Sequence, residues 1–107
     1  LLGRARRLGE ILAARLGGFK ERFEIVGDVR GIGPMLAMEL VTDRHTKAPA
    51  ADQAKALGRF CFEKGLVILT CGRYGNVVRL LMPLVITDEQ LQRGLAILEE
   101  GLAALKR

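Results

Sequence analysis

The order of its apolar patterns is the feature that most constrains what this chain can fold into. Three stretches carry apolar residues at spacings of three and four, as amphipathic helices do, and two pairs of short strand-like apolar runs lie between them. The helical stripes are Ala5, Leu8, Leu12 and Leu16; Ala54, Leu57, Phe60 and Cys61; and Leu91, Leu95, Leu98 and Leu102. This order predicts an α+β fold in which helices cover one side of a small antiparallel sheet.

The strand-like runs also predict which side chains share a face. The expected strands are Ile25-Val26, Met35 to Val41, Leu66 to Leu69 and Val77 to Met82. Because side chains alternate along a strand, Ala37 and Glu39 should share one face and Met38 the other. A short segment with two glycines, residues 70–76, joins the last two strands so closely that they are expected to pair antiparallel.

Glycines and one capping pair set the predicted ends of the helices. Glycine commonly ends a helix, and a threonine followed three residues later by glutamine is a capping-box pattern that begins one. Glycines seven residues apart lie almost on one line of a helix and predict close packing there. The first helix is expected to end at Gly17-Gly18 and the second at Gly65. The second helix should begin at about Ala51, and the last should begin at Thr87 with Gln90 as its capping partner. Close packing is expected at Gly94 and Gly101 of the last helix.

The length and charge of the chain exclude several classes of protein. Its 107 residues, half of them apolar, suffice for a single domain, residues 1–107, with one core. No apolar run approaches the roughly 20 residues of a membrane span, so no membrane association is expected. The net charge of +5 is spread along the chain, and five aromatic residues offer little for stacking on bases. Nucleic acid is therefore not an expected partner.

The first residues suggest a piece of a longer protein. The chain begins with Leu1-Leu2 instead of Met and enters a helical pattern without a capping residue. Arg4 and Glu10 interrupt the segment that a secretory signal would keep apolar. We therefore expect a fragment of a larger cytoplasmic protein.

Arg79 is the residue that the sequence singles out for function. It stands in the apolar run Val77 to Met82, and a guanidinium cannot lose its proton to escape burial, so it requires an acidic partner. A carboxylate suits the planar fork of arginine, because two parallel hydrogen bonds can form. One interpretation is an internal ion pair with Glu39, the only acid within the other apolar strand. The alternative is that Arg79 lies at an open edge of the sheet and binds the carboxylate of a ligand.

The other reactive residue types form no recognisable catalytic or metal site. His45 is the only histidine and lies in a polar loop, while Cys61 and Cys71 are expected to be free thiols. Gly31-Ile32-Gly33 lacks the third glycine and the following helix of a dinucleotide-binding loop, and should form a sharp turn into a strand. None of the five lysines stands among the apolar neighbours that a Schiff-base lysine needs. We predict no catalytic, cofactor-binding or metal-binding residue in this chain.

Four stretches of the chain form an ordered series of motifs: residues 26–40 (VGDVRGIGPMLAMEL), 65–68 (GLVI), 75–84 (GNVVRLLMPL) and 86–91 (ITDEQL). Together they resemble the C-terminal segment of class III aminotransferases, most of all those acting on 4-aminobutyrate. The resemblance implies the small C-terminal domain of the fold type I enzymes that use pyridoxal 5'-phosphate (PLP). Pro34 stands where family members vary, which bears only on the local turn.

The same resemblance implies a function for a full-length parent. Such an enzyme moves an amino group from an amino acid through PLP to 2-oxoglutarate, a 2-oxo acid. Its large domain, upstream of the matching segment, holds PLP, and a second subunit completes a homodimer. Arg79 matches the family arginine that binds the α-carboxylate of glutamate or 2-oxoglutarate and otherwise pairs with a large-domain glutamate. The chain alone is then expected to be inactive.

Two other functions are open on the sequence alone. A non-enzymatic α+β binding or oligomerisation module would use Arg79 and the sheet face for an acidic group of a partner. A nucleic-acid-binding domain would use the first helix, because residues 1–24 hold six lysines and arginines against three acids.

Overall fold

The predicted order of elements is confirmed, with one short strand added. The computed structural model describes residues 2–32, 35–81 and 87–105. The elements in chain order are α1 (Leu2–Arg22), β1 (Val26–Ile32), β2 (Met35–Asp43), β3 (Ala48–Pro49), α2 (Ala51–Glu63), β4 (Leu69–Cys71), β5 (Val77–Leu81) and α3 (Asp88–Leu105).

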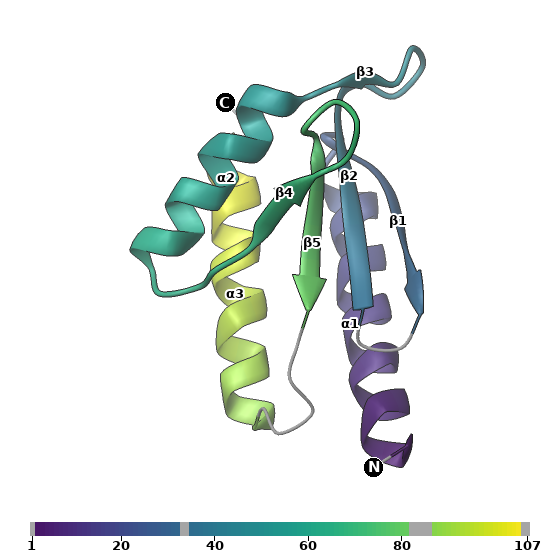
Figure 1. Cartoon of the computed structure of the whole chain (residues 1–107), viewed down its shortest axis with the longest axis vertical. Coiled ribbons are helices and arrows are strands. Elements are labelled where there is room, and N and C mark those ends of the chain that lie inside the picture. Colours follow the sequence, from purple (N-terminus) through teal and green to yellow (C-terminus); the bar gives the residue numbers. More distant parts are fainter. Residues whose placement is uncertain (1, 33–34, 82–86, 106–107) are drawn as a thin grey trace.

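The strands form one antiparallel sheet in the order β1-β2-β5-β4, and β3 pairs with the end of β2. β2 and β5 are neighbours at the centre of the sheet although α2 and β4 lie between them in sequence (Figure 1). The predicted antiparallel pairing of β4 with β5 is confirmed. The central position of β2 gives its residues a neighbour on both sides.

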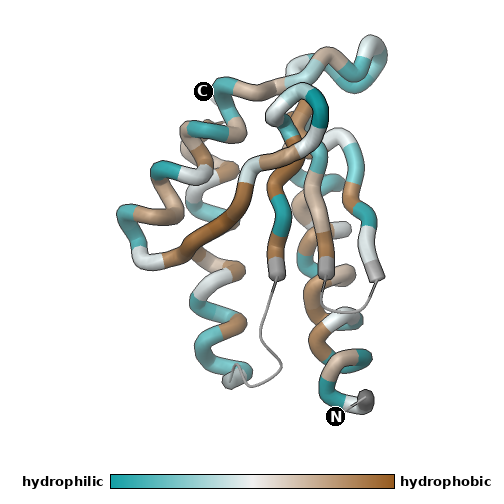
Figure 2. The backbone as a smooth tube through the Cα atoms, viewed as in Figure 1, coloured by the Kyte–Doolittle hydropathy of each residue, from teal (hydrophilic) through white to brown (hydrophobic). Residues whose placement is uncertain are grey.

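The helices pack on one side of this sheet and form a single core with it. α1 contacts β1 and β2, while α2 contacts α3 and β4 (Figure 1). The predicted stripes of all three helices supply buried residues to this core, and so does one face of the strands. Figure 2 shows the most apolar stretches in β5 and in the segment that leads into β4. The buried strand residues of the core are Val26, Leu36, Met38, Leu40, Val78 and Leu80.

The first helix does not end at Gly17-Gly18, as predicted, but continues to Arg22. Phe19, only 1% exposed, and Phe23 extend the stripe of Leu16 at spacings of three and four. Each glycine costs a helix about 1 kcal/mol relative to alanine, whereas burying a phenylalanine gains roughly 1.5–3 kcal/mol. The prediction was wrong because core packing outweighed local propensity.

Two predicted strand boundaries are also corrected. β1 extends through Arg30 to Ile32, where a turn was expected. β4 begins at Leu69, whereas residues 66–68 lead out of α2 and place Leu66 and Ile68 against the core without pairing. Only residues 69–71 pair with β5, and in the predicted strand 66–69 only Leu66 and Ile68 contact the core. Gly33, Pro34 and Met82 lie outside the described residues.

The predicted helix ends at α2 and α3 are confirmed. Gly65 follows α2 with φ of 92°, a conformation that favours glycine. Before α3, the Thr87 side-chain oxygen accepts a hydrogen bond from the Gln90 backbone N–H, and the Gln90 side chain accepts one from the Thr87 backbone N–H, both at 3.0 Å. A Cβ atom placed on Gly101 would lie 2.5 Å from Cδ1 of Leu57, which confirms close packing on this helix.

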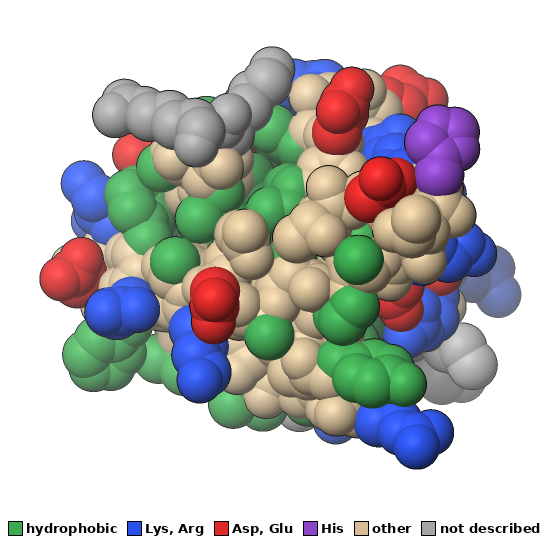
Figure 3. Space-filling model, turned by 90° about the horizontal axis from the view of Figure 1, so that it is seen from above, with side chains coloured by type: hydrophobic (Ala, Val, Ile, Leu, Met, Phe, Trp, Pro, Cys, Tyr) green, Lys and Arg blue, Asp and Glu red, His purple; other side chains and the backbone are tan. Residues whose placement is uncertain are grey.

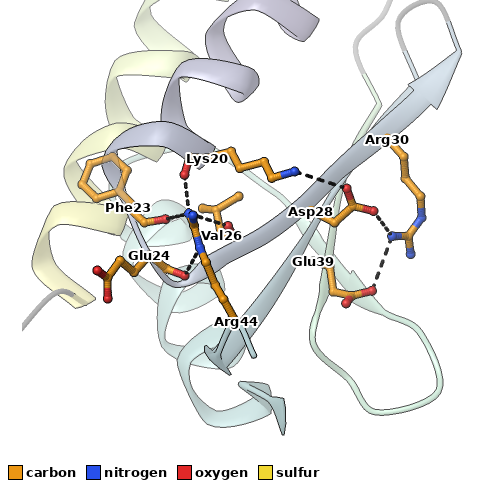
Figure 4. A network of polar contacts seen from close by, with 8 residues as sticks. All are labelled: Lys20, Phe23, Glu24, Val26, Asp28, Arg30, Glu39 and Arg44. Atoms are coloured by element: carbon orange, nitrogen blue, oxygen red, sulfur yellow. Dashed lines mark hydrogen bonds and ion pairs between the residues drawn. The ribbon is translucent and has the colours of Figure 1, made fainter. Parts of the chain in front are cut away.

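Arg44, which the sequence did not single out, ties the β2–β3 turn to the end of α1 (Figure 4). Its Nε donates to the carbonyl of Glu24 at 3.0 Å, and its Nη2 donates to the carbonyls of Phe23 and Val26, each at 3.0 Å, and to that of Lys20. The last carbonyls of a helix lack partners within the helix and carry partial negative charge. One guanidinium therefore caps α1 and holds the chain that enters β1.

Replacing Arg44 with alanine is expected to lower the free energy of unfolding by about 1–2 kcal/mol, because these carbonyls lose a charged donor. Urea denaturation followed by circular dichroism measures the loss. Arg44→Lys, which keeps the charge but not the planar fork, should recover only part of it. His45→Ala, a change at the exposed neighbouring residue, serves as control, and an equal loss in that variant would contradict the capping role.

Candidate functional site

The face of the sheet opposite the helices is the candidate site. The strand residues that alternate with the buried ones point to this side, as predicted for Ala37 and Glu39. In β1 and β2 the face carries charges, and in β4 it carries Leu69, which is 54% exposed. The residues of this open face are Asp28, Arg30, Ala37, Glu39, Val77, Arg79, Leu69 and Cys71.

Arg79 lies near the middle of the open face. In the register of the sheet it stands opposite Ala37 of β2 on one side and Leu69 of β4 on the other. Its side chain is exposed, whereas Val78 and Leu80 on either side of it point into the core. Of the two positions considered for Arg79, it is not buried, and it does not lie at an edge of the sheet, because β5 pairs on both sides. Alternation along β5 turns its side chain away from its apolar neighbours in sequence and onto the open face.

The internal ion pair between Arg79 and Glu39 is absent from the structure. Nη1 of Arg30 lies 3.4 Å from Glu39 Oε2 and 3.1 Å from Asp28 Oδ2, and Nζ of Lys20 lies 3.9 Å from Asp28 Oδ1 (Figure 4). Glu39 is thus paired with Arg30 from β1. Within the described ranges, Arg79 has no hydrogen bond or ion pair.

Arg30 is the residue of this face that sequence reasoning missed. It lies between the predicted strand Ile25-Val26 and the predicted turn at Gly31-Ile32-Gly33, so no role was expected for it. The structure instead places Gly31 within β1, paired with Leu36, so the expected turn does not begin at Gly31. A strand follows this segment, as predicted, and the described part of it offers no phosphate-binding helix start.

The remaining candidates of the sequence form no catalytic group. His45 is exposed, and Figure 3 shows the histidine at the surface among charged side chains. Cys61 and Cys71 are free, and burial raises the pKa of the Cys61 thiol to about 11. A thiol with such a pKa stays protonated at neutral pH and is a poor nucleophile. No group of three or more metal-ligating side chains exists among the described residues.

Two of the cavities at the surface are lined entirely by described residues, and Arg79 lines neither of them. One of about 500 Å³ lies beside the Arg44 cluster and includes Lys20 and Asp28, whose charges face each other. The other, about 560 Å³, lies between the end of α1 and the end of α3. Neither of these two cavities encloses the part of the open face around Arg79. In the part of the chain that is described, no helix has the length and apolar character of a membrane span.

The arrangement defines an α+β domain with an exposed guanidinium on the sheet face that the helices leave uncovered, and such a group can bind a carboxylate. The sequence profile of the family described as "Aminotransferase class-III" matches residues 1–102. The chain belongs to the class III aminotransferase family.

Individual relatives agree with this assignment. The chain is 46% identical over 100 residues to a 5-aminovalerate aminotransferase of Pseudomonas aeruginosa and 43% identical over 101 residues to a 4-aminobutyrate aminotransferase of Escherichia coli; each match covers 94% of this chain and 24% of the relative. It is also 45% identical over 103 residues to a leucine/methionine racemase of Thermococcus litoralis, covering 96% of this chain and 23% of that protein. The chain thus spans about a quarter of the length of these relatives.

A solved structure confirms the fold. An amine transaminase from an uncultivated Pseudomonas species, in its PLP-bound form, superimposes with a TM-score of 0.83 at 30% identity, covering 96% of this chain and 23% of that chain. The predicted α+β class, with a small antiparallel sheet and helices, is confirmed.

PLP is the cofactor that the family implies, and the residues described in this chain do not fit it. Lys20, Lys47, Lys55 and Lys64 are all exposed. Lys20 faces Asp28, and the ammonium of Lys64 lies 5.7 Å from the centre of the Phe60 ring. None of these four lysines stands in an enclosed site where it could bond to a cofactor, and Lys106 lies outside the described residues.

Proposed function

We propose that residues 1–107 are the small C-terminal domain of a longer, PLP-dependent ω-amino acid aminotransferase. The parent would transfer the amino group of a donor such as 4-aminobutyrate or 5-aminovalerate to 2-oxoglutarate. The family assignment supports the reaction class, and the names of the two bacterial relatives support the donor class. The large domain of the parent holds PLP, a second subunit completes a homodimer, and the enzyme works in the cytoplasm.

Within this proposal, Arg79 binds the carboxylate of the 2-oxo acid. The observation that carries this role is the exposed Arg79 side chain without a partner among the described residues, on a face that the helices leave open. A guanidinium binds a carboxylate through two parallel, charge-assisted hydrogen bonds. Leu69 and Val77 beside it would shield these bonds from water once the rest of the enzyme covers the face.

A second candidate function is amino acid racemisation, favoured by the 45% identity to the Thermococcus litoralis racemase. A racemase inverts one substrate and needs no acceptor, whereas a transaminase consumes a donor and an acceptor in equal amounts. The two functions are therefore separable by stoichiometry.

The full-length protein that carries these residues, loaded with PLP, should form glutamate from 2-oxoglutarate in step with the consumption of 4-aminobutyrate or 5-aminovalerate. Glutamate formation is measured by chromatography with each donor in turn. Inversion of leucine, methionine or alanine without any acceptor would instead establish the racemase. The 107-residue chain alone should be inactive, and activity in it would refute the division of the site between two domains. A stable, specific oligomer of the chain combined with an inactive full-length protein would favour a non-enzymatic binding module.

A further inference from the structure

Two arginines flank one small residue on the open face. Ala37 of β2 stands opposite Arg30 of β1 on one side and opposite Arg79 of β5 on the other. Glu39 lies two residues further along β2 on the same face, so it is diagonal to both arginines. Diagonal neighbours in antiparallel pairs are about 7–8 Å apart, which long side chains can span. By position alone, Glu39 could pair with either guanidinium.

The structure shows Glu39 paired with Arg30, whose guanidinium also contacts Asp28. Asp28 stands directly opposite Glu39 in the register, an arrangement in which two like charges repel. Arg30 bridges these two carboxylates, and Lys20 adds a second positive charge beside Asp28 (Figure 4). The positive charges of Arg30 and Lys20 neutralise the negative charges of Asp28 and Glu39, and Arg79 forms no ion pair with this cluster.

We propose that Arg30 is a positioning residue that holds Glu39 away from Arg79 and so keeps Arg79 available to the substrate carboxylate. The proposal rests on the proposed function, because it assigns a ligand to Arg79. Without Arg30, Asp28 repels Glu39 from the β1 side, and Arg79 is the arginine that lies diagonal to Glu39 across the β2–β5 pair. Glu39 then occupies the guanidinium as an internal carboxylate and competes with the ligand.

The test measures binding without chemistry. Glutarate, a dicarboxylate that has no group to transfer, is titrated into the PLP-loaded full-length enzyme by calorimetry. Arg30→Met is expected to raise the Kd of glutarate about three- to sixfold. This is the factor expected if an ion pair between Glu39 and Arg79, with the strength usual for exposed pairs, competes with glutarate for the guanidinium. The increase should shrink in high salt, because exposed pairs are screened.

A second substitution separates competition from general damage. Arg30→Met combined with Glu39→Gln should restore the wild-type Kd, because the competing carboxylate is gone. Arg59→Met removes one exposed positive charge from α2 and should leave the Kd unchanged. If Arg30→Met does not fold, Arg30→Gln takes its place with the same expectations.

The outcomes separate this inference from the proposed function. If wild-type enzyme does not bind glutarate, or binds it equally well with Arg79→Ala, the role of Arg79 fails and the inference fails with it. If binding depends on Arg79 but is unchanged in Arg30→Met, or is weakened and not restored by Glu39→Gln, only the inference is overturned. A weakened Kd that Glu39→Gln restores establishes it.

Discussion

Replacing Arg79 with alanine in the full-length parent is expected to raise the KM for 2-oxoglutarate by about 10- to 100-fold. The change removes charge-assisted hydrogen bonds to the carboxylate, which contribute about 1.5–3 kcal/mol. Because Arg79 is exposed on the open face and its neighbours Val78 and Leu80 hold the core, the fold should not depend on its guanidinium. Steady-state kinetics with 2-oxoglutarate varied at a fixed donor concentration measures the effect.

The controls for this prediction separate charge from geometry. Arg79→Lys keeps the positive charge but loses the planar fork, so it should recover part of the affinity and not all of it. The affinity for PLP should be unchanged in both variants, because the cofactor is assigned to the large domain. Arg59→Ala should behave as wild type. An unchanged KM in Arg79→Ala would remove Arg79 from the site.

The largest loss of stability is expected from Leu57→Ala, at about 2–5 kcal/mol. Leu57 is fully buried in α2, and its Cδ1 would lie 2.5 Å from a Cβ atom placed on Gly101 of α3. Truncation removes apolar contacts and leaves a cavity between two helices whose backbones are already close. Urea denaturation of the chain, followed by circular dichroism, gives the change in the free energy of unfolding.

Two further variants test whether the α2–α3 contact carries this loss. Gly101→Ala added to Leu57→Ala should recover stability, since the new methyl group fills part of the cavity and alanine favours a helix by about 1 kcal/mol over glycine. Leu69→Ala, at a residue 54% exposed, should change stability by less than about 0.5 kcal/mol. A loss in Leu57→Ala as small as that in Leu69→Ala would mean that this contact contributes little.

The helices were the most predictable part of the fold. The start of α2 and the capping box of α3 follow from patterns within a few residues, because helical hydrogen bonds and caps are local. α1 shows the limit of such reasoning. Its passage through Gly17-Gly18 depends on the burial of Phe19 and Phe23 in the core. Their spacing from Leu16 is helical, but the two glycines between them favour a helix end, and only the packing decides between these local signals.

The candidate residue could be chosen from the sequence, but its surroundings could not. Arg79 was chosen because it is an arginine inside an apolar run. Glu39 and a ligand carboxylate were the two partners left open for it, and in the structure Glu39 pairs with Arg30 instead. Both arginines lie diagonal to Glu39, and the residue opposite Glu39 on β1 is Asp28, which also contacts Arg30.

The sequence by itself determined the order of the elements, the α+β class and the buried stripes of the helices, and it singled out Arg79 as the candidate ligand-binding residue. All of these depend on residue type and on spacing within single segments. Only the tertiary structure decided the register that aligns Arg30, Ala37 and Arg79 in one row, since strand pairing joins residues far apart in the chain. In this register Arg79 lies exposed on the sheet face that the helices leave uncovered, and Arg30 forms the ion pair with Glu39.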